Sequence, residues 1–178
     1  MTDAKLPLTS TPLPPQVSIL TERLRIRTLL QDDISALHAL DSDPEVKKYL
    51  AGPTKHTLEE YKSNFPTYHD PYEILVVEEL QTHAFVGRVG MMKRWENLRE
   101  IAVVLGPQYW DKGYGSELGV ALRDFAVQNL YPVAVIGCVD PLNSKSIKML
   151  TKLGFVRDPS INDRYHSTNV VYKYCPQS

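Results

Sequence analysis

Residues 105–117, LGPQYWDKGYGSE, carry the end of an apolar run, a loop with two close glycines and the start of an amphipathic pattern. The overlapping segment 100–105 (EIAVVL) is almost wholly apolar, which is typical of a buried central strand. After the loop, Leu118 and Leu122 recur at helical spacing and predict a helix over 115–130. The first amides of a helix lack internal partners, and glycines let phosphates approach them closely. The stretch therefore predicts either a pyrophosphate-binding loop or an ordinary strand-to-helix connection with turn glycines.

Two other phosphate-binding motifs fit this loop less well. The dinucleotide-binding fingerprint needs three glycines and an early strand–helix–strand unit, whereas the loop has only Gly113 and Gly115. The P-loop needs a glycine followed by lysine and then serine or threonine, whereas Lys112 precedes its glycine. Both motifs are therefore disfavoured.

The composition of the whole chain bounds its class. Its 178 residues suit one domain, and 43% apolar residues suffice for a sizeable core. The 20 Lys and Arg balance 21 Asp and Glu, which argues against a general nucleic-acid binder because such proteins usually show a basic excess. Cys138 and Cys175 are too few for a disulfide scaffold or a four-thiolate zinc site, and the histidines show no metal-ligand spacing. We therefore expect no metal, no nucleic-acid partner and a reducing, cytoplasmic compartment.

The N-terminal residues differ in composition from the rest of the chain. Residues 1–17 hold four prolines among small and polar residues, and no apolar run there is long enough for a secretory core or a membrane span. We expect this segment to be a mobile, extended tail and residues 18–175 to form a single domain. The sequence predicts no membrane association.

The predicted elements follow one another in the order of a mixed α/β domain. Alternating or continuous apolar runs predict strands, and apolar residues at helical spacing predict helices. The strands are expected at 21–28, 73–80, 84–95, 100–105, 133–139, 154–158 and 165–174. The helices are expected at 32–40 with Asp32 as cap, after Asp43-Pro44-Glu45, from a Thr57/Glu60 capping box to about Phe65, at 115–130 and at 143–153.

A second informative segment follows the predicted strand at 133–139. Residues 140–155, DPLNSKSIKMLTKLGF, place a polar turn before an amphipathic helix that ends in Gly154-Phe155. Together with residues 105–117, this segment resembles the GNAT superfamily of acyl-CoA-dependent N-acetyltransferases, and most closely the branch that acetylates the N-terminal amines of ribosomal proteins. The resemblance covers residues 18–175, and its pieces, in the family's order, are Leu20-Thr21-Glu22-Arg23-Leu24 with Arg27, Asp43-Pro44-Glu45-Val46 with Tyr49-Leu50, Val86-Gly87, Trp110-Asp111-Lys112-Gly113-Tyr114-Gly115 with Glu117, and Asn143, Ser146, Leu150, Lys152 and Gly154-Phe155.

This resemblance implies a fold and a coenzyme site. The implied fold is a mixed, mostly antiparallel sheet flanked by helices, in which a splayed pair of parallel strands binds coenzyme A. The pantetheine arm is expected along the backbone of Val103, Val104 and Leu105 and beside Asn143. The pyrophosphate is expected on the loop that begins at Trp110, on the backbone amides of Asp111, Lys112, Gly113, Tyr114, Gly115 and Ser116. Glu117 is expected to complement the N-terminus of the helix.

The loop departs from the family pattern at two positions. Trp110 stands where Arg or Gln is common, and Asp111 stands where Gly is frequent. A carboxylate beside a pyrophosphate is unfavourable unless it points to solvent. We expect the neighbouring Lys112 to offset the charge of Asp111.

Acetyl transfer to an amine needs a base, donors for the tetrahedral oxyanion and a proton or hydrogen bond for the leaving thiolate. The resemblance places the oxyanion donors at backbone amides near Leu105. Many family members protonate the thiolate with a Tyr at the position of Leu150, so that acid is absent here. In the ribosomal branch a Ser at the position of Ser146 serves instead; Ser146 either does this or only orders the cofactor and the helix start. Glu100 is the candidate base, with an exposed strand-end carboxylate as the alternative.

The resemblance implies an enzyme that moves acetyl from acetyl-CoA directly to a primary amine through a ternary complex, without a metal. The acceptor is either a protein N-terminus or a small-molecule amine, and the chain is either a monomer or a homodimer. Asp158 and Asp163 either border the acceptor site or are solvated loop carboxylates. The alternatives are a non-catalytic acyl-CoA-binding sensor of the same fold and a transferase for a longer acyl group.

Overall fold

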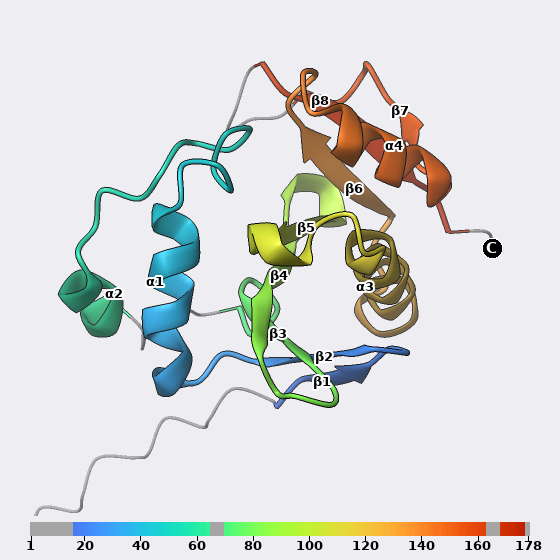
Figure 1. Cartoon of the computed structure of the whole chain (residues 1–178). Coiled ribbons are helices and arrows are strands. Elements are labelled where there is room, and N and C mark those ends of the chain that lie inside the picture. Colours follow the sequence, from blue (N-terminus) through green and yellow to red (C-terminus); the bar gives the residue numbers. More distant parts are fainter. Residues whose placement is uncertain (1–15, 65–69, 163–167, 177–178) are drawn as a thin grey trace, which may run out of the picture.

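The computed structural model describes residues 16–64, 70–162 and 168–176 and contains one eight-stranded sheet (Figure 1). Its strands lie in the order β1-β2-β3-β4-β5-β6-β8-β7, and within the described residues β5 and β6 form its one parallel pair. The strands are β1 Ser18–Leu20, β2 Leu24–Thr28, β3 Leu75–Glu79, β4 Phe85–Lys93, β5 Leu98–Leu105, β6 Ala134–Val139, β7 Val156–Arg157 and β8 Val170–Tyr174. The helices are α1 Ile34–Ser42, α2 Leu58–Asn64, α3 Tyr114–Leu130 and α4 Ser144–Lys152. The predicted α/β fold with a mixed, mostly antiparallel sheet is confirmed.

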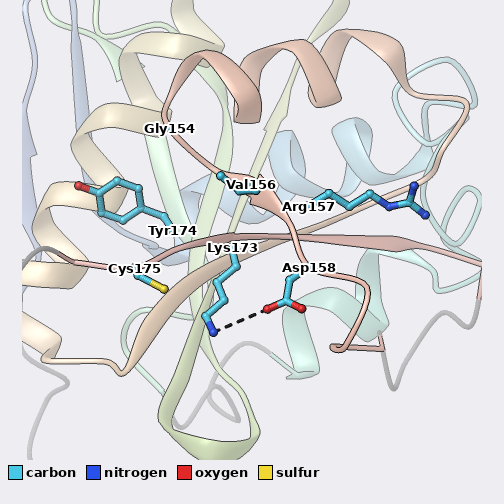
Figure 2. Close-up of a pocket in the computed structure, with 7 residues that line it drawn as sticks. All are labelled: Gly154, Val156, Arg157, Asp158, Lys173, Tyr174 and Cys175. Atoms are coloured by element: carbon cyan, nitrogen blue, oxygen red, sulfur yellow. Dashed lines mark ion pairs between the residues drawn. The ribbon is translucent and has the colours of Figure 1, made fainter.

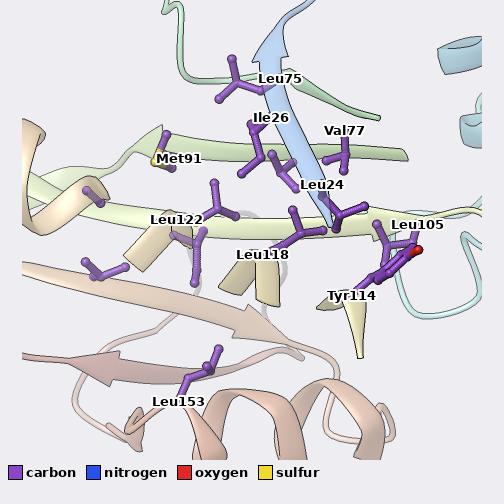
Figure 3. Packing of buried hydrophobic residues seen from close by; sticks show 14 of the residues in the cluster. Leu24, Ile26, Leu75, Val77, Met91, Leu105, Tyr114, Leu118, Leu122 and Leu153 are labelled. Carbon is purple, nitrogen blue, oxygen red and sulfur yellow. The ribbon is translucent and has the colours of Figure 1, made fainter. Parts of the chain in front are cut away.

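Helices lie on both sides of this sheet, with α1 and α2 on one side and α3 and α4 on the other (Figure 1). The larger core lies between the sheet and α3, where Leu118 and Leu122 are fully buried against β-strand residues that include Leu24 and Ile26 (Figure 3). These α3 positions are four residues apart and lie on one helical face, as the sequence predicts. The packing fixes α3, and with it the loop that precedes the helix.

The N-terminal strand is shorter than predicted. In place of one strand over 21–28, β1 and β2 form an antiparallel pair joined by a turn at residues 21–23. The Thr21 hydroxyl closes this turn by accepting the Leu24 N–H at 3.0 Å, while the Thr21 N–H donates to the Leu24 carbonyl at 2.9 Å. Residues 1–15 of the predicted tail lie outside the described residues. Val17 is buried in the core, and its N–H donates to the Thr28 hydroxyl at 2.8 Å.

The region before β3 departs from prediction at two places. A 3-10 turn, Gln31–Asp33, leads into α1, and the carboxylate of Asp33, not that of Asp32, stabilises this turn by accepting the Leu30 N–H at 2.8 Å. The segment after Asp43 forms hydrogen-bonded turns instead of a short helix. Asp43 does accept the Glu45 N–H at 2.8 Å, but two of the three backbone bonds that follow span three residues instead of four, so no regular helix propagates.

The capping box that precedes α2 forms as predicted. The Glu60 carboxylate accepts the Thr57 N–H at 2.6 Å, and the Thr57 hydroxyl accepts the Glu60 N–H at 3.3 Å. Hydrogen bonding by Thr57 lowers the pKa of Glu60 below its ordinary value. The predicted helix end at Phe65 lies outside the described residues, and the last described residue of α2 is Asn64.

Candidate active site

The two parallel strands at the centre of the sheet diverge. β5 and β6 pair from Leu98 and Ala134 to Glu100 and Ile136, and among the described residues the pairing stops there. Beyond this point β5 pairs with β4 as far as Leu105, and β6 pairs with β8. The β6-facing backbone groups of β5 after Glu100 are thus without a ladder partner in the described sheet. This is the splay that the resemblance implies, and it covers the predicted pantetheine positions Val103, Val104 and Leu105.

The loop after β5 is tied back to the strand end. Residues 107–109 form a single turn of 3-10 helix, and the Trp110 indole N–H donates to the Leu105 carbonyl at 2.9 Å. Asp111 and Gly113 then adopt left-handed backbone angles, with φ of 59° and 83°. Trp110 therefore holds the loop against the end of β5, which gives this tryptophan a structural role at the position where the family commonly has Arg or Gln.

The loop leads directly into the N-terminus of α3. Gly113 is the N-cap of this 17-residue helix. Because glycine has no side chain to cap the helix, the first amides, those of Tyr114, Gly115 and Ser116, receive no side-chain cap from it. The helix dipole places partial positive charge there. A Cβ on Gly115 would lie 3.4 Å from the Met149 sulfur of α4, so α4 packs closely beside this helix start. The arrangement is that of an anion-binding helix terminus beside two diverging strands.

The charge of Asp111 is offset by a residue other than the one predicted. Both carboxylate oxygens of Asp111 contact the Lys145 ammonium, at 2.9 and 2.8 Å. Lys112 instead places its ammonium 5.4 Å from the ring centroid of Tyr109. The expectation that Lys112 compensates Asp111 is therefore wrong. The ion pair, which is exposed, links the loop before α3 to the first turn of α4.

Glu117 binds the β1–β2 turn. Its carboxylate accepts hydrogen bonds from the Thr21 hydroxyl at 2.5 Å and the Arg23 N–H at 2.9 Å, and it forms an ion pair with the Arg23 guanidinium at 2.7 Å. Burial opposes ionisation of Glu117, but these hydrogen bonds and the Arg23 charge prevail and lower its pKa. Hydrogen bonding to Glu117 likewise raises the pKa of Arg23. Sequence reasoning gave Arg23 no role at the site, because its partner lies 94 residues away.

Asn143 and Ser146 lie together at the start of α4. Asn143 is the N-cap, and its side-chain oxygen accepts the Ser146 N–H at 3.1 Å. The bond orders the start of α4 through the backbone of Ser146, and neither alternative for its hydroxyl is tested by it. The predicted contacts of both residues with the cofactor, and the predicted service of Ser146 to the thiolate, stay predictions.

Leu150 occupies the position of the family's usual tyrosine and packs in the core. It is buried, and a Cβ added to Gly137 of β6 would lie 2.8 Å from one of its methyl carbons. Because Gly137 directly follows the last β6 residue paired with β5, Leu150 fills the space beside the splay. The side chain has no group that transfers a proton.

Glu100 lies at the last β5 position that pairs with β6. Its carboxylate contacts Arg94 at 2.5 Å, and its side chain is only 12% exposed. The alternative of an exposed strand-end carboxylate is therefore wrong. Arg94 and the strand hold Glu100 where β5 and β6 diverge, and its role as base stays a prediction.

Asp158 is paired with Lys173 of β8. It lies in a cavity of about 430 Å³ at the β7–β8 edge, where it pairs with Lys173 at 3.7 Å (Figure 2). Hydrogen bonds from the Ser160 hydroxyl and N–H lower the pKa of Asp158, with a smaller contribution from Lys173. A carboxyl of lowered pKa is a poor proton acceptor. Asp163 lies outside the described residues.

The comparison with known families identifies the chain. The model of the acetyltransferase (GNAT) domain matches residues 23–156. This protein belongs to the GNAT acetyltransferase family. It is 28% identical over 156 residues to an uncharacterised N-acetyltransferase, p20, of Bacillus licheniformis, a match that covers 82% of this chain and 86% of the relative.

Two solved structures share the fold of this GNAT protein. A GNAT-family acetyltransferase from Bacillus anthracis superimposes with a TM-score of 0.73 and 27% identity, covering 89% of this chain and 96% of that one. Spermidine N-acetyltransferase from Vibrio cholerae, solved in complex with CoA and spermine, superimposes with a TM-score of 0.71 and 20% identity, covering 84% of this chain and 92% of that one. The second likeness shows the fold alone.

Two further findings concern residues 16–64, 70–162 and 168–176, which the structure describes. No group of three or more His, Cys, Asp or Glu side chains in these ranges is placed to hold a metal ion. None of the helices in these ranges combines the length and apolarity needed to span a bilayer.

Proposed function

We propose that this GNAT protein transfers acetyl from acetyl-CoA directly to a primary amine within a ternary complex. The observation that carries the proposal is the divergence of β5 and β6 after Glu100 beside the uncapped N-terminus of α3. Diverging strands offer backbone donors and acceptors to an extended chain, and the helix terminus offers amides to an anion. The diverging strands suit the extended pantetheine arm of coenzyme A, and the helix terminus suits its pyrophosphate.

Coenzyme A is held mainly by backbone groups in this proposal. The pantetheine arm pairs with β5 over Val103–Leu105, and the pyrophosphate rests on amides of residues 111–116. The helix dipole favours the anion, and Lys145 removes the repulsion that the Asp111 carboxylate would otherwise exert. Coenzyme A in the Vibrio cholerae structure of the same fold supports this part of the proposal.

The acetyl group then lies where the strands diverge. The amine nitrogen attacks the thioester carbon, the carbon–sulfur bond breaks, and the coenzyme leaves as a thiolate that takes up a proton. Amides near Leu105 stabilise the oxyanion, and Ser146 hydrogen-bonds the thiolate. Glu100, directly or through water, accepts the proton that the amine loses.

The acceptor is a primary amine of either a small molecule or a protein N-terminus. Spermine in the Vibrio cholerae structure supports the small-molecule class. A thiol-release assay tests the proposal by mixing acetyl-CoA with spermidine, spermine, single amino acids and short peptides with free N-termini. Turnover with at least one amine, abolished when its amino group is blocked, is the expected result.

A second function is favoured by one observation. The leucine that replaces the usual tyrosine acid is a core residue, as expected of a protein that keeps the coenzyme site without turnover. Coenzyme A binding with no thiol release on any amine of the panel would make the chain an acyl-CoA sensor and overturn the catalytic proposal.

A further inference from the structure

Arg23 reaches from the β1–β2 turn to the loop that precedes α3. Its Nη1 donates to the Lys112 carbonyl at 2.9 Å, 89 residues along the chain. Its Nε donates to Glu117 at 2.8 Å, and its guanidinium carbon lies 4.6 Å from the ring centroid of Tyr114. One side chain therefore contacts both the loop and the first turn of the helix.

The position of Arg23 is fixed by its own backbone. Its N–H donates to Glu117 at 2.9 Å, and its carbonyl accepts the Leu80 N–H at 3.0 Å. The Thr21 hydroxyl donates to the same Glu117 oxygen at 2.5 Å. The guanidinium is thus presented to the loop by a turn that is bonded to Leu80, directly after β3, on one side and to α3 on the other.

The contact with the Lys112 carbonyl sets the direction of the next amide. The described peptide bonds are all trans, so the Lys112 carbonyl and the Gly113 N–H point in opposite directions. The carbonyl points to Arg23, and the Gly113 N–H therefore points away from the β1–β2 turn. Glycine tolerates backbone angles of either sign, so Gly113 does not itself select one orientation of this peptide. The hydrogen bond from Arg23 to the Lys112 carbonyl selects the orientation of this peptide.

Arg23 contributes through geometry more than through net charge. Its guanidinium is paired with Glu117 at 2.7 Å, so the two charges largely cancel at a distance. A lysine in its place would retain the ion pair, but its single nitrogen cannot reach both acceptors as the separate nitrogens of the rigid guanidinium do. The Lys112 carbonyl and Glu117 are those two acceptors.

We propose that Arg23 is a positioning residue for coenzyme A, which orients the Lys112–Gly113 peptide so that the Gly113 amide donates to the pyrophosphate. The inference rests on the proposed function, since it takes the loop as the pyrophosphate site. It adds a requirement that the loop sequence and the helix dipole do not include: Arg23, which is remote in sequence, must set the direction of the Gly113 N–H toward the pyrophosphate.

The test combines an affinity with a signal from the amide itself. Protein labelled with ¹⁵N at glycine gives a simple amide spectrum, because the chain has nine glycines. Coenzyme A is titrated into the wild type, Arg23→Lys and Arg25→Lys. Arg25 is the matched control, because its side chain is 41% exposed against 43% for Arg23 and it pairs with Glu78 instead of the loop. Melting temperatures are recorded for all three.

In the wild type and in Arg25→Lys, the Gly113 signal should shift on coenzyme A binding with the same affinity. In Arg23→Lys, the Gly113 shift should shrink and the affinity should fall about tenfold, the loss of one hydrogen bond to a charged group. An unchanged affinity and Gly113 shift in Arg23→Lys would overturn the inference while leaving the proposed function intact. Absence of binding by the wild type would overturn both.

A general loss of structure is separated from loss of positioning by two further observations. The Gly52 and Gly87 signals, from residues outside the loop, should be the same in all three proteins. If Arg25→Lys lowered the affinity for coenzyme A as much as Arg23→Lys, the effect would be non-specific and the inference would be overturned. If Arg23→Lys is too unstable to titrate, Arg23→Gln replaces it, and the same two outcomes decide.

Discussion

Replacing Gly137 by alanine should force Leu150 out of its present position. A Cβ on Gly137 would lie 2.8 and 2.9 Å from the two methyl carbons of Leu150. Carbon atoms in contact prefer about 3.5–4.0 Å, so the leucine would have to retreat by about 1 Å. Both residues are buried between β6 and α4, where extra volume costs about 1–3 kcal/mol. The free energy of unfolding of Gly137→Ala should fall by that amount.

A double-mutant cycle assigns this cost to the contact itself. Leu150→Ala alone should cost about 2–5 kcal/mol, the usual range for such a core truncation. In the double variant the new methyl group enters space that Leu150 has vacated. The double variant should therefore cost less than the sum of the single variants by about 1 kcal/mol, within the range for residues in contact.

Urea unfolding at neutral pH measures all four proteins of the cycle. Each kcal/mol should also appear as a shift of roughly 2–4 °C in melting temperature for a chain of this size. Strict additivity of the two single variants, or a Gly137→Ala variant as stable as the wild type, would refute the packing argument.

The remaining predictions concern the loop, the helix starts and the N-terminus. Hydrogen bonds lower the pKa of Glu117, so its contribution to stability is complete above the ordinary carboxyl pKa of about 4.3 and is lost as the pH falls through the lowered pKa. In urea unfolding, the wild type should therefore lose more stability on acidification than Glu117→Gln. Equal losses in the two proteins would contradict this. Lys145→Gln leaves Asp111 uncompensated and should weaken coenzyme A binding about two- to fivefold in low-salt calorimetry, with recovery in the double variant Asp111→Asn/Lys145→Gln. Ser146→Ala should lower turnover more than acetyl-CoA affinity, and the reverse pattern would leave Ser146 a binding residue only. A chain that starts at Ser18 should melt below one that starts at Gln16, because only the shorter chain lacks the buried Val17; equal melting temperatures would argue against that packing.

Local periodicity accounts for the parts of the fold that sequence reasoning predicted well. The Leu118 and Leu122 stripe of α3 and the Thr57/Glu60 capping box depend on neighbours within one or two turns. Such patterns are readable because the partner residues are near in sequence. The divergence of β5 and β6 was implied only by the family resemblance, since a strand's own residues do not say where its pairing ends.

The errors arose where non-local contacts decide. The segment 21–28 reads as one alternating strand, but residues 21–23 form a turn, and Glu117 of α3 holds that turn by accepting hydrogen bonds from the Thr21 hydroxyl and the Arg23 N–H. Lys112 is the nearest cation to Asp111 in sequence, yet Lys145 reaches it from α4. No local pattern distinguishes the cation that folding brings close from the one that is adjacent, because the difference lies in the packing of α4 beside α3.

Calorimetric titration of coenzyme A into the wild type, Gly113→Val and Gly52→Val tests the central claim most directly. Both glycines have a φ of 83°, so valine introduces similar backbone strain at either position, but only Gly113 lies in the proposed pyrophosphate loop. If the loop holds the pyrophosphate, the wild type and Gly52→Val should bind coenzyme A alike, and Gly113→Val should bind it about tenfold more weakly or worse. Equal affinities for all three proteins, or no binding by the wild type, would contradict it.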